Sequence, residues 1–422
     1  MRRLKLVLSC VLGLSVLAPM ASQAQGLDIT SLINQTAPAS VAKFERFKKQ
    51  LWPEAKRKGV SRAMFTRAFQ GVLPDPAVLK SAAKQPEFTT PPWDYVNKRV
   101  SDRRIGNGQE KLAELPGVLR EIEARYGVDR HVVVSIWGME SSYGFILNNP
   151  KIVRPVIQSL ATLAFNGKSQ RRRKFGRTQL LAALQILQNG DTVPERMLGS
   201  WAGAMGHTQF IPTTYRAYAV DFDGDGRRDI WDNEADALAS TAAYLKKSGW
   251  QTGQTWGYEV KLPANYNYGV TGRKIKKSLA DWSRLGVRRA NGKPFPRPGD
   301  VAWMEIMAGG RGPAFLMLRN FRAIMRYNNS VSYALAVGHL ADRLRGGAVF
   351  IQPWPEGDRM LNQAERMDLQ RLLRAQGYGV SKIDGKIGPN TRKAVRAFQA
   401  RIGMAADGFV TKNLLDRLRQ SS

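Results

Sequence analysis

The chain has 422 residues, more than one hydrophobic core usually holds, so we expect at least two domains. Its 65 Lys and Arg outnumber 34 Asp and Glu, and the formal net charge of +31 favours an acidic polymer or surface as partner. The single cysteine, Cys10, excludes an internal disulfide and a thiolate metal cluster.

Residues 1–24 are typical of a secretory signal peptide. Three cations precede an apolar run over residues 6–18, which is too short to span a bilayer comfortably, and Ser22-Gln-Ala24 supplies small residues for cleavage. Cys10 lies too early for a lipoprotein signal, and an uncleaved anchor is the alternative. We therefore expect a periplasmic protein that is soluble after cleavage and has no transmembrane segment in its mature form.

Helical spacing dominates residues 25 to about 250, with helices expected at residues 41–58, 113–126, 179–188 and 235–247. Within this part, Glu140 follows the apolar stretch from Val132 to Trp137. A carboxylate in a buried helix needs either a specific partner or a chemical role, because desolvation disfavours its charged form. From the pattern alone, the structural and the catalytic interpretations of Glu140 have equal weight.

The segment from Gly199 to Tyr215 combines small residues with neutral hydrogen-bonding side chains. Gly199, Gly203 and Gly206 permit close backbone approach, while Ser200 and Gln209 offer polar groups. This composition suits a wall for a hydroxyl-rich ligand, and tight helix packing is the alternative interpretation.

Residues 221–232 match a twelve-residue calcium loop, with acids at positions one, three, five, nine and twelve and Gly226 at position six. Asp232 is shorter than the usual Glu at the last position, which weakens bidentate ligation. A solvated Asp-Gly turn is the alternative, and only one such loop is present, so we expect a structural ion and not a sensor. The predicted oxygen ligands are Asp221, Asp223, Asp225, the Arg227 carbonyl, Asp229 and Asp232.

The remaining chain predicts a β-rich insertion at about 253–312, helix again over 313–344, a linker at 346–358 and a separate unit at 359–420. The segment from Arg326 to Tyr333 gathers aromatic and amide groups, as sugar sites often do. The last unit shows three helices, at 361–375, 390–401 and 411–418, joined by two Asp-Gly turns.

Four ordered motifs, SIWGMESSYG, GSWAGAMGHTQFIPTTY, DFDGDGRRDIW and MRYNNSVSYALAVGHLADRL, resemble the membrane-bound lytic transglycosylase B family over residues 41–344. Residues 359–420 resemble the three-helix peptidoglycan-binding domain of wall enzymes. The resemblance implies a mainly α (α+β) fold: a lysozyme-like catalytic domain at 25–345 with a helical lobe and a small β-rich insertion, followed by the three-helix domain. The lipid anchor of some members is not matched.

The resemblance further implies cleavage of the β-1,4 bond between N-acetylmuramic acid and N-acetylglucosamine, leaving a 1,6-anhydromuramic acid end, during cell-wall turnover. Glu140 matches the single catalytic glutamate, and the calcium loop belongs to the family pattern. It implies a structural calcium ion and no organic cofactor. The positions that match the sugar groove are Ser200, Gln209, Tyr244, Tyr327, Asn328 and Tyr333, and Tyr95 and Arg172 are further expected contacts.

Most glycosidases use two carboxyl groups, but no second acid stands out in these motifs, because the Asp cluster belongs to the metal loop. Glu140 would then serve first as acid toward the glycosidic oxygen and next as base toward the C6 hydroxyl, while the substrate's N-acetyl group stabilises the cationic centre. We expect peptidoglycan strands as partner. Nothing in the sequence specifies a protein partner such as another wall enzyme.

Three other functions are alternatives. A hydrolytic muramidase of the same fold would leave a reducing end, and a non-catalytic wall-binding scaffold would not need Glu140. The charge alone suggests a nucleic-acid or lipid-surface binder, but no nucleic-acid motif is present. The three histidines, His131, His207 and His339, are scattered and indicate no zinc site.

Overall fold

The computed structural model describes residues 38–83, 90–355, 357 and 359–421, so the signal peptide predicted at residues 1–24 lies outside the described residues. The described chain divides into two compact units. The first contains residues 38–83, 111–126 and 136–244, and the second contains residues 90–110, 127–135 and most of the chain from 245 onward.

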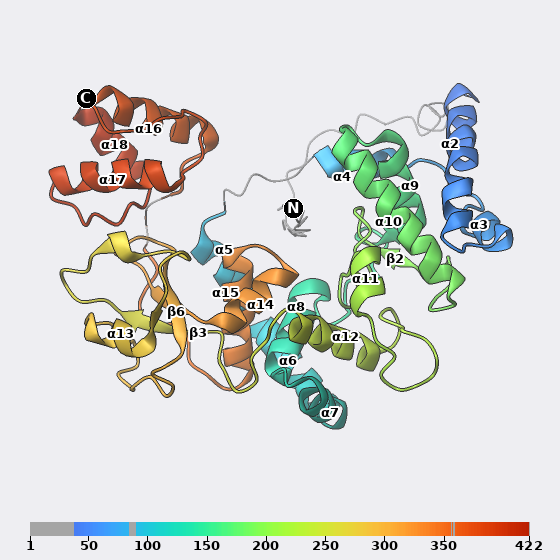
Figure 1. Cartoon of the computed structure of the whole chain (residues 1–422), viewed down its shortest axis with the longest axis horizontal. Coiled ribbons are helices and arrows are strands. Elements are labelled where there is room, and N and C mark those ends of the chain that lie inside the picture. The colour runs from blue at the N-terminus through green and yellow to red at the C-terminus, as the bar shows by residue number, and fades with distance from the viewer. Residues whose placement is uncertain (1–37, 84–89, 356, 358, 422) are drawn as a thin grey trace, which may run out of the picture. The chain divides into compact units, whose positions relative to one another are not determined.

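The first unit is helical and centres on α9 (Val156–Asn166) and α10 (Gln170–Gln188), which pack along each other (Figure 1). Gly176 permits this approach, because a Cβ there would lie 2.5 Å from the Ala164 backbone nitrogen. Its other elements are α2 (Pro38–Arg57), α3 (Arg62–Ala68), α4 (Pro76–Ala83), α7 (Pro116–Tyr126), the strand pair β1 (Arg154–Pro155) and β2 (Leu198–Gly199), α11 (Pro212–Tyr218) and most of α12 (Glu234–Lys247).

Two helix starts differ from the sequence-based expectation. The helix expected at 113–126 begins at Pro116, because proline has no amide hydrogen to continue the upstream helix α6 (Asp102–Glu114). Helix α10 begins at Gln170 instead of residue 179. Its first half carries a run of Arg and Lys that gives no apolar stripe, and Ser169 caps it by accepting from the Arg172 amide.

The second unit contains an antiparallel five-stranded sheet with strand order β4-β6-β7-β3-β5. Its core includes Trp282, whose Nε1 donates to the carbonyl oxygen of Ala302 at 3.1 Å. The expected β-rich insertion is therefore present. Its elements are β3 (Gly257–Lys261), the short helix η1 (Tyr268–Val270), β4 (Lys277–Ser278), α13 (Leu279–Arg284), β5 (Arg288–Arg289), β6 (Val301–Ile306) and β7 (Ala314–Met317).

The helix expected from residue 313 onward is wrong for residues 314–317. These residues form β7, which pairs with both β3 and β6 and is buried throughout. A short apolar run that is buried on both faces has no period that separates strand from helix. Helix returns with α14 (Arg319–Tyr327) and α15 (Val331–Leu344), and the unit also holds α5 (Pro92–Arg99).

The predicted linker is attached to the second unit. The ring of Phe350 stacks on His339 of α15 with centroids 3.8 Å apart. The amides of Ile351 and Gln352 donate to the Glu259 carboxylate at 2.8 and 2.7 Å. Over residues 346–355 the chain is therefore held by specific contacts and is not a free tether.

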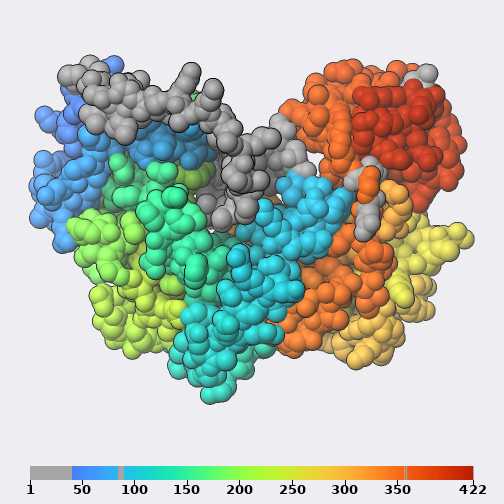
Figure 2. All heavy atoms as spheres, turned by 180° about the vertical axis from the view of Figure 1, so that it is seen from behind, coloured from blue at the N-terminus to red at the C-terminus, as the bar shows by residue number. Residues whose placement is uncertain are grey.

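The C-terminal helices α16 (Gln363–Ala375), α17 (Pro389–Arg401) and α18 (Lys412–Gln420) enclose a core of their own and form one rounded body in Figure 2. Two buried glutamines hold the two predicted turns. Gln370 Oε1 accepts from the Gly385 amide at 2.8 Å, and Gln399 Oε1 accepts from the Gly408 amide at the same distance. The same device is thus used twice in the domain.

In the part of the chain that the structure describes, no helix is both long and apolar enough to cross a membrane.

Candidate functional site

Glu140 lies in the last turn of α8 (Arg130–Ser141). All eight residues from Val132 to Met139 are buried, whereas the Glu140 side chain is half-buried. The helix thus holds a rigid, apolar stem in the protein and presents a carboxyl group at its end. This placement suits a group for proton transfer, because the buried stem fixes its position while the carboxyl group stays within reach of a ligand.

The turn after Glu140 has an unusual backbone. Ser142, Tyr143 and Gly144 all have positive φ angles, of 51°, 59° and 87°. For a residue other than glycine this region costs about 1–2 kcal/mol, so the surroundings must hold Ser142 and Tyr143 in place. Ser141 Oγ accepts from the Gly144 amide at 3.1 Å, so the chain leaves the helix at Ser141, the residue after Glu140.

A buried contact joins α8 to the segment from Gly199 to Tyr215. Trp137 Nε1 donates to His207 Nδ1 at 2.8 Å, and the two rings lie 5.5 Å apart. The Tyr143 ring packs edge-on to Trp137 at 5.6 Å. Gly144 fits only as glycine, because a Cβ would lie 2.4 Å from the His207 ring. One turn of helix before Glu140 is therefore fixed by His207.

The sequence did not single out His207 by itself, although the motif contained it. Burial lowers the pKa of His207 to about 4, so the ring is neutral near pH 7. Since Nδ1 accepts from Trp137, the proton sits on Nε2. No sequence pattern could have predicted the pairing, because 70 residues separate the two partners.

This pairing predicts a pH dependence of stability. The folded pKa of about 4 lies below the ordinary 6.5, so the protonated form is favoured in the unfolded chain. The contribution of His207 is complete above about pH 6.5, falls as the pH drops, and is exhausted near pH 4, at a cost of about 3 kcal/mol. Denaturant unfolding of the wild type and of His207→Gln between pH 7.5 and 4 measures this.

Glutamine can accept from Trp137 but does not titrate, so the His207→Gln curve should be flatter over this window. Thr66→Gln, at an exposed site of α3 that does not titrate, is the control and should follow the wild type. Parallel curves for wild type and His207→Gln would contradict the assignment.

The segment after β2 is a tight, glycine-dependent loop. Ser200 is buried, and its Oγ accepts from the amides of Ala202 and Ala204 at 3.3 and 3.1 Å. Gln209 has a positive φ of 51°, and its Nε2 donates to the Gly206 carbonyl at 2.9 Å. Both predicted sugar-contacting residues therefore also hold the loop's own backbone.

Tyr244 of α12 lies in an aromatic cluster of the same unit. Its ring is 5.7 Å from Phe210, which follows Gln209, and 4.7 Å from Tyr218. Arg172 is half-buried in the first turn of α10. Glu140, Ser200, Gln209, Tyr244 and Arg172 thus belong to one unit.

The other four predicted sugar contacts belong to the second unit. Tyr327 ends α14, and Asn328, which is buried, is its C-cap. Tyr333 is buried in the first turn of α15, and Tyr95 is half-buried on α5, with the Arg99 guanidinium 5.6 Å from its ring. Each of these residues lies at or near the end of a helix.

The predicted calcium loop contains a convergence of carboxylates that only partly matches the predicted set. Asp221, Asp223 and Asp236 place one oxygen each within 4.8 Å of one another. Asp236, which was not among the predicted ligands, is buried in the first turn of α12. Burial, together with the nearby charges of Asp223 and Asp221, raises its pKa to about 6. Three oxygens facing one another fit a hard cation such as calcium.

The other predicted carboxylate ligands do not belong to this convergence. Asp225 accepts from the Arg227 guanidinium, which lowers the Asp225 pKa, and Asp232 accepts from Arg196. Asp229 Oδ1 accepts from the Trp231 and Asp232 amides at 2.8 and 2.9 Å. These three carboxylates are therefore held beside the convergence. The spacing of the twelve-residue loop could not predict Asp236, because Asp236 lies after the end of that loop.

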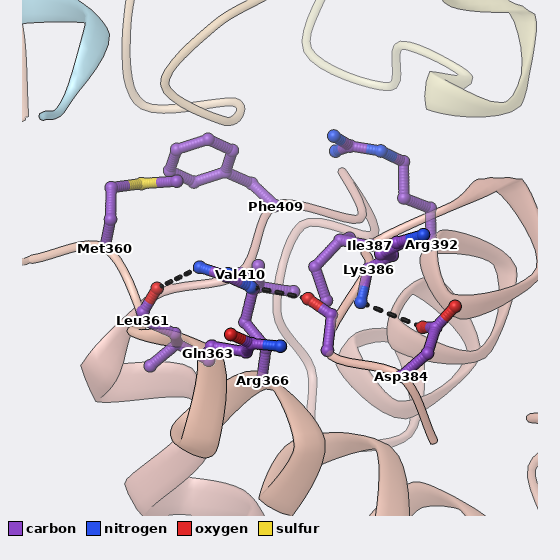
Figure 3. Close-up of a pocket in the computed structure, with 11 residues that line it drawn as sticks. Met360, Leu361, Gln363, Arg366, Asp384, Lys386, Ile387, Arg392, Phe409 and Val410 are labelled. Atoms are coloured by element: carbon purple, nitrogen blue, oxygen red, sulfur yellow. Dashed lines mark hydrogen bonds between the residues drawn. The ribbon is translucent and has the colours of Figure 1, made fainter. Parts of the chain in front are cut away.

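The C-terminal domain has a pocket of about 490 Å³ (Figure 3). Arg366 ties its walls together, since Nη1 donates to the Leu361 carbonyl at 2.7 Å and Nε donates to the Gly385 carbonyl at 2.6 Å. Apolar side chains line the pocket beside charged ones. The lining residues include Met360, Leu361, Arg366, Asp384, Lys386, Ile387, Arg392, Phe409 and Val410.

Comparison with known proteins decides the family. The Transglycosylase SLT domain matches residues 43–342, which is more than half of the chain. The chain belongs to this transglycosylase family. The Putative peptidoglycan binding domain matches residues 362–418 of the same transglycosylase.

Solved and curated relatives agree. The transglycosylase is 31% identical to membrane-bound lytic murein transglycosylase B of Escherichia coli strain K12 over 263 residues, covering 62% of this chain and 69% of that protein. The crystal structure of SltB3 from Pseudomonas aeruginosa, in complex with NAG-anhNAM-pentapeptide, is 52% identical, with a TM-score of 0.82 over 89% of this chain and 99% of that one. The Escherichia coli lytic transglycosylase SLT35 in complex with calcium is 27% identical, with a TM-score of 0.59 over 72% of this chain and 92% of that chain.

The predicted family, fold class and enzyme class are confirmed: the chain is a lytic murein transglycosylase with a lysozyme-like fold.

Proposed function

We propose that Glu140 is the only acid/base of this transglycosylase, serving as the acid in the first step and as the base in the second. The chain cleaves the β-1,4 bond between N-acetylmuramic acid and N-acetylglucosamine in peptidoglycan and forms a 1,6-anhydromuramic acid end. The observation that carries the proposal is the setting of Glu140, on a buried helix that a strained turn ends and the Trp137–His207 bond fixes.

In the first step, the protonated Glu140 carboxyl would give its proton to the glycosidic oxygen as the C1–O bond breaks. The N-acetyl group of the muramic acid would stabilise the positive charge at C1. In the second step, the Glu140 carboxylate would take the proton of the C6 hydroxyl, whose oxygen then bonds to C1. The proton lost in one step is regained in the next, so Glu140 ends in its starting state and no water is consumed.

Ser200, Gln209 and Asn328 would orient the sugars through hydrogen bonds, and Tyr244, Tyr327 and Tyr333 would pack on their rings. Tyr95 and Arg172 are further proposed contacts. Ser200 and Gln209 support this role because their loop is attached to α8 by His207, so a ligand that contacts them lies near the helix that carries Glu140.

The products distinguish this mechanism from that of a hydrolytic muramidase. Digestion of purified peptidoglycan should give muropeptides with an anhydro end, each lighter by one water than the hydrolytic product, and mass spectrometry of the released sugars measures this. Reducing muramic acid ends as the main product would show that water attacks C1 and would overturn the single-residue mechanism.

We further propose that calcium is a structural ion in the 221–232 loop, held by Asp221, Asp223 and Asp236. The convergence of three carboxylates supports this proposal. Asp225, Asp229, Asp232 and the Arg227 carbonyl complete the loop as neighbours or as further ligands. When bound, the ion would neutralise a cluster that otherwise repels itself, and it would not take part in bond cleavage.

The pocket of the C-terminal domain is the proposed contact of that domain with the wall polymer, because its apolar and charged lining suits both acetamido groups and peptide. We also propose that the protein is exported to the periplasm. The proposed domains are a catalytic domain at 25–345 with the β-rich insertion at about 253–312, a linker at 346–358 and a wall-binding domain at 359–420.

A further inference from the structure

A second cavity, of about 530 Å³, lies in the second unit between the sheet and α14. Four of its seven lining residues are cations, and none is an acid. No step of the sugar chemistry uses this cavity, which we call the basic cleft. Its lining residues are Ser248, Lys276, Val301, Trp303, Arg319, Arg322 and Arg326.

The three arginines of the basic cleft come from one face of α14. Arg319, Arg322 and Arg326 follow a spacing of three and four residues, which places them in a row on a helix. At 1.5 Å rise per residue, the row is about 10 Å long. It therefore offers several guanidinium groups to one extended ligand, and not a single point charge.

Three of the four cations are available to a ligand. Lys276, Arg319 and Arg322 are exposed, and within the described residues none of the three forms an ion pair with a carboxylate. Arg319 Nε donates to the Gly249 carbonyl at 3.3 Å, which directs its side chain. Exposed arginines with no acidic partner repel one another, so an anion bound between them is stabilised.

Of the other three lining residues, Val301 and Trp303 are apolar and Ser248 is polar. Trp303 is buried, and its Nε1 donates to Glu305 at 3.1 Å, so its polar atom is already satisfied. Glu305 is not among the lining residues, and burial raises its pKa. Val301 is 53% exposed. The cleft thus places two apolar side chains beside a row of guanidinium groups, whose paired N–H donors match the two oxygens of a carboxylate.

We propose that the basic cleft binds the peptide stem of peptidoglycan through its carboxylates, and so selects peptide-bearing glycan. The inference rests on the proposed function, because the same chain must then hold a sugar strand. Helix α14 supports this choice: its last residue, Tyr327, and its C-cap, Asn328, directly follow Arg326 and are proposed sugar contacts. A peptide joined to a sugar held there is the anion nearest to the row. In peptide-bearing strands the lactyl carboxyl group of each muramic acid is in the amide bond to the peptide, so the carboxylates that the row could recognise lie on the peptide.

The test compares two substrates with full-length protein. Peptidoglycan glycan strands are prepared with their peptides and, after amidase treatment, without them. The lactyl carboxylates that the amidase exposes are converted to methylamides, so that the peptide-free strands carry no anion. For Arg319→Gln/Arg322→Gln, the ratio of kcat/KM on peptide-bearing to peptide-free strands should fall about tenfold relative to wild type, mostly through KM. This difference should shrink at high salt, because exposed charges are screened.

The matched control is Lys274→Gln/Lys293→Gln, which removes the same charge from exposed positions of the same unit outside the cleft. Its substrate ratio should equal that of the wild type. An unchanged ratio in the arginine variant, or an equal fall in the control, would overturn the proposal.

Binding to vesicles of anionic phospholipid gives a further arm. If the arginine variant loses vesicle binding while its substrate ratio stays at the wild-type value, the cleft recognises lipid phosphate and the peptide proposal is rejected. If wild type cleaves neither substrate, the proposed function fails instead, which is a separate outcome from a changed ratio.

Discussion

Replacing Glu140 with glutamine should lower the turnover of purified peptidoglycan by at least about a thousandfold. One residue supplies the proton for bond cleavage and removes the proton for ring closure, and each such role is worth about 10²–10⁴ in rate. Glutamine has nearly the same shape but cannot exchange a proton. Release of soluble anhydro-muropeptides, quantified by mass spectrometry, measures the loss.

Binding should survive this change. Pelleting of Glu140→Gln with insoluble peptidoglycan should match the wild type, because the sugar-contacting residues and the C-terminal domain are unaltered. Glu121→Gln, at an exposed position of α7, is the control and should keep full turnover. Substantial turnover by Glu140→Gln would exclude Glu140 as the acid/base, whereas lost binding together with a lower melting temperature would show that the fold has changed.

The second large effect should come from calcium. An ion that binds only the folded state at a hundredfold excess over its Kd stabilises that state by about 2.7 kcal/mol, which corresponds to a rise in Tm of about 5 °C or more. Chelation should therefore lower the Tm of the wild type, and Asp223→Ala should lower it as well. Calcium titrations followed by differential scanning fluorimetry measure both effects.

Asp223 is the informative position because its carboxylate belongs to the converging group and its Oδ2 also accepts from Asn233 Nδ2 at 2.7 Å. In Asp223→Ala the calcium-dependent rise should be largely lost. Asp416→Ala, a carboxylate of α18 far along the chain, should keep the full response. If calcium changes neither the Tm nor the protease resistance of the wild type, the structural ion is ruled out.

Local patterns predicted most of the elements. The apolar spacing of residues 41–58 and 235–247 predicted α2 and α12 nearly to their ends, and the Asp-Gly turns of the C-terminal domain are present where expected. The helix predicted at residues 314–317 was wrong for a physical reason. They form the central strand of the sheet, paired with β6 and β3, and burial on both faces removes the alternation that identifies a strand.

The candidate site divides in the same way. The residue types of the motifs, together with the resemblance, identified Glu140 and the calcium loop. They did not identify Asp236, which lies outside the loop spacing, or the role of His207, whose partner is Trp137. The basic cleft was likewise hidden, because its arginines appear in the sequence as the polar face of an ordinary amphipathic helix.

By itself, therefore, the sequence determined the composition, the helix periods, the turn chemistry and the motif order, and with them the family. These properties depend on residues within a few turns of one another. The tertiary structure alone decided that His207 fixes the helix of Glu140, that Asp236 joins the carboxylates, and that Lys276 meets the α14 arginines. Each is a contact between distant segments, set by the packing of buried surfaces that no local period encodes.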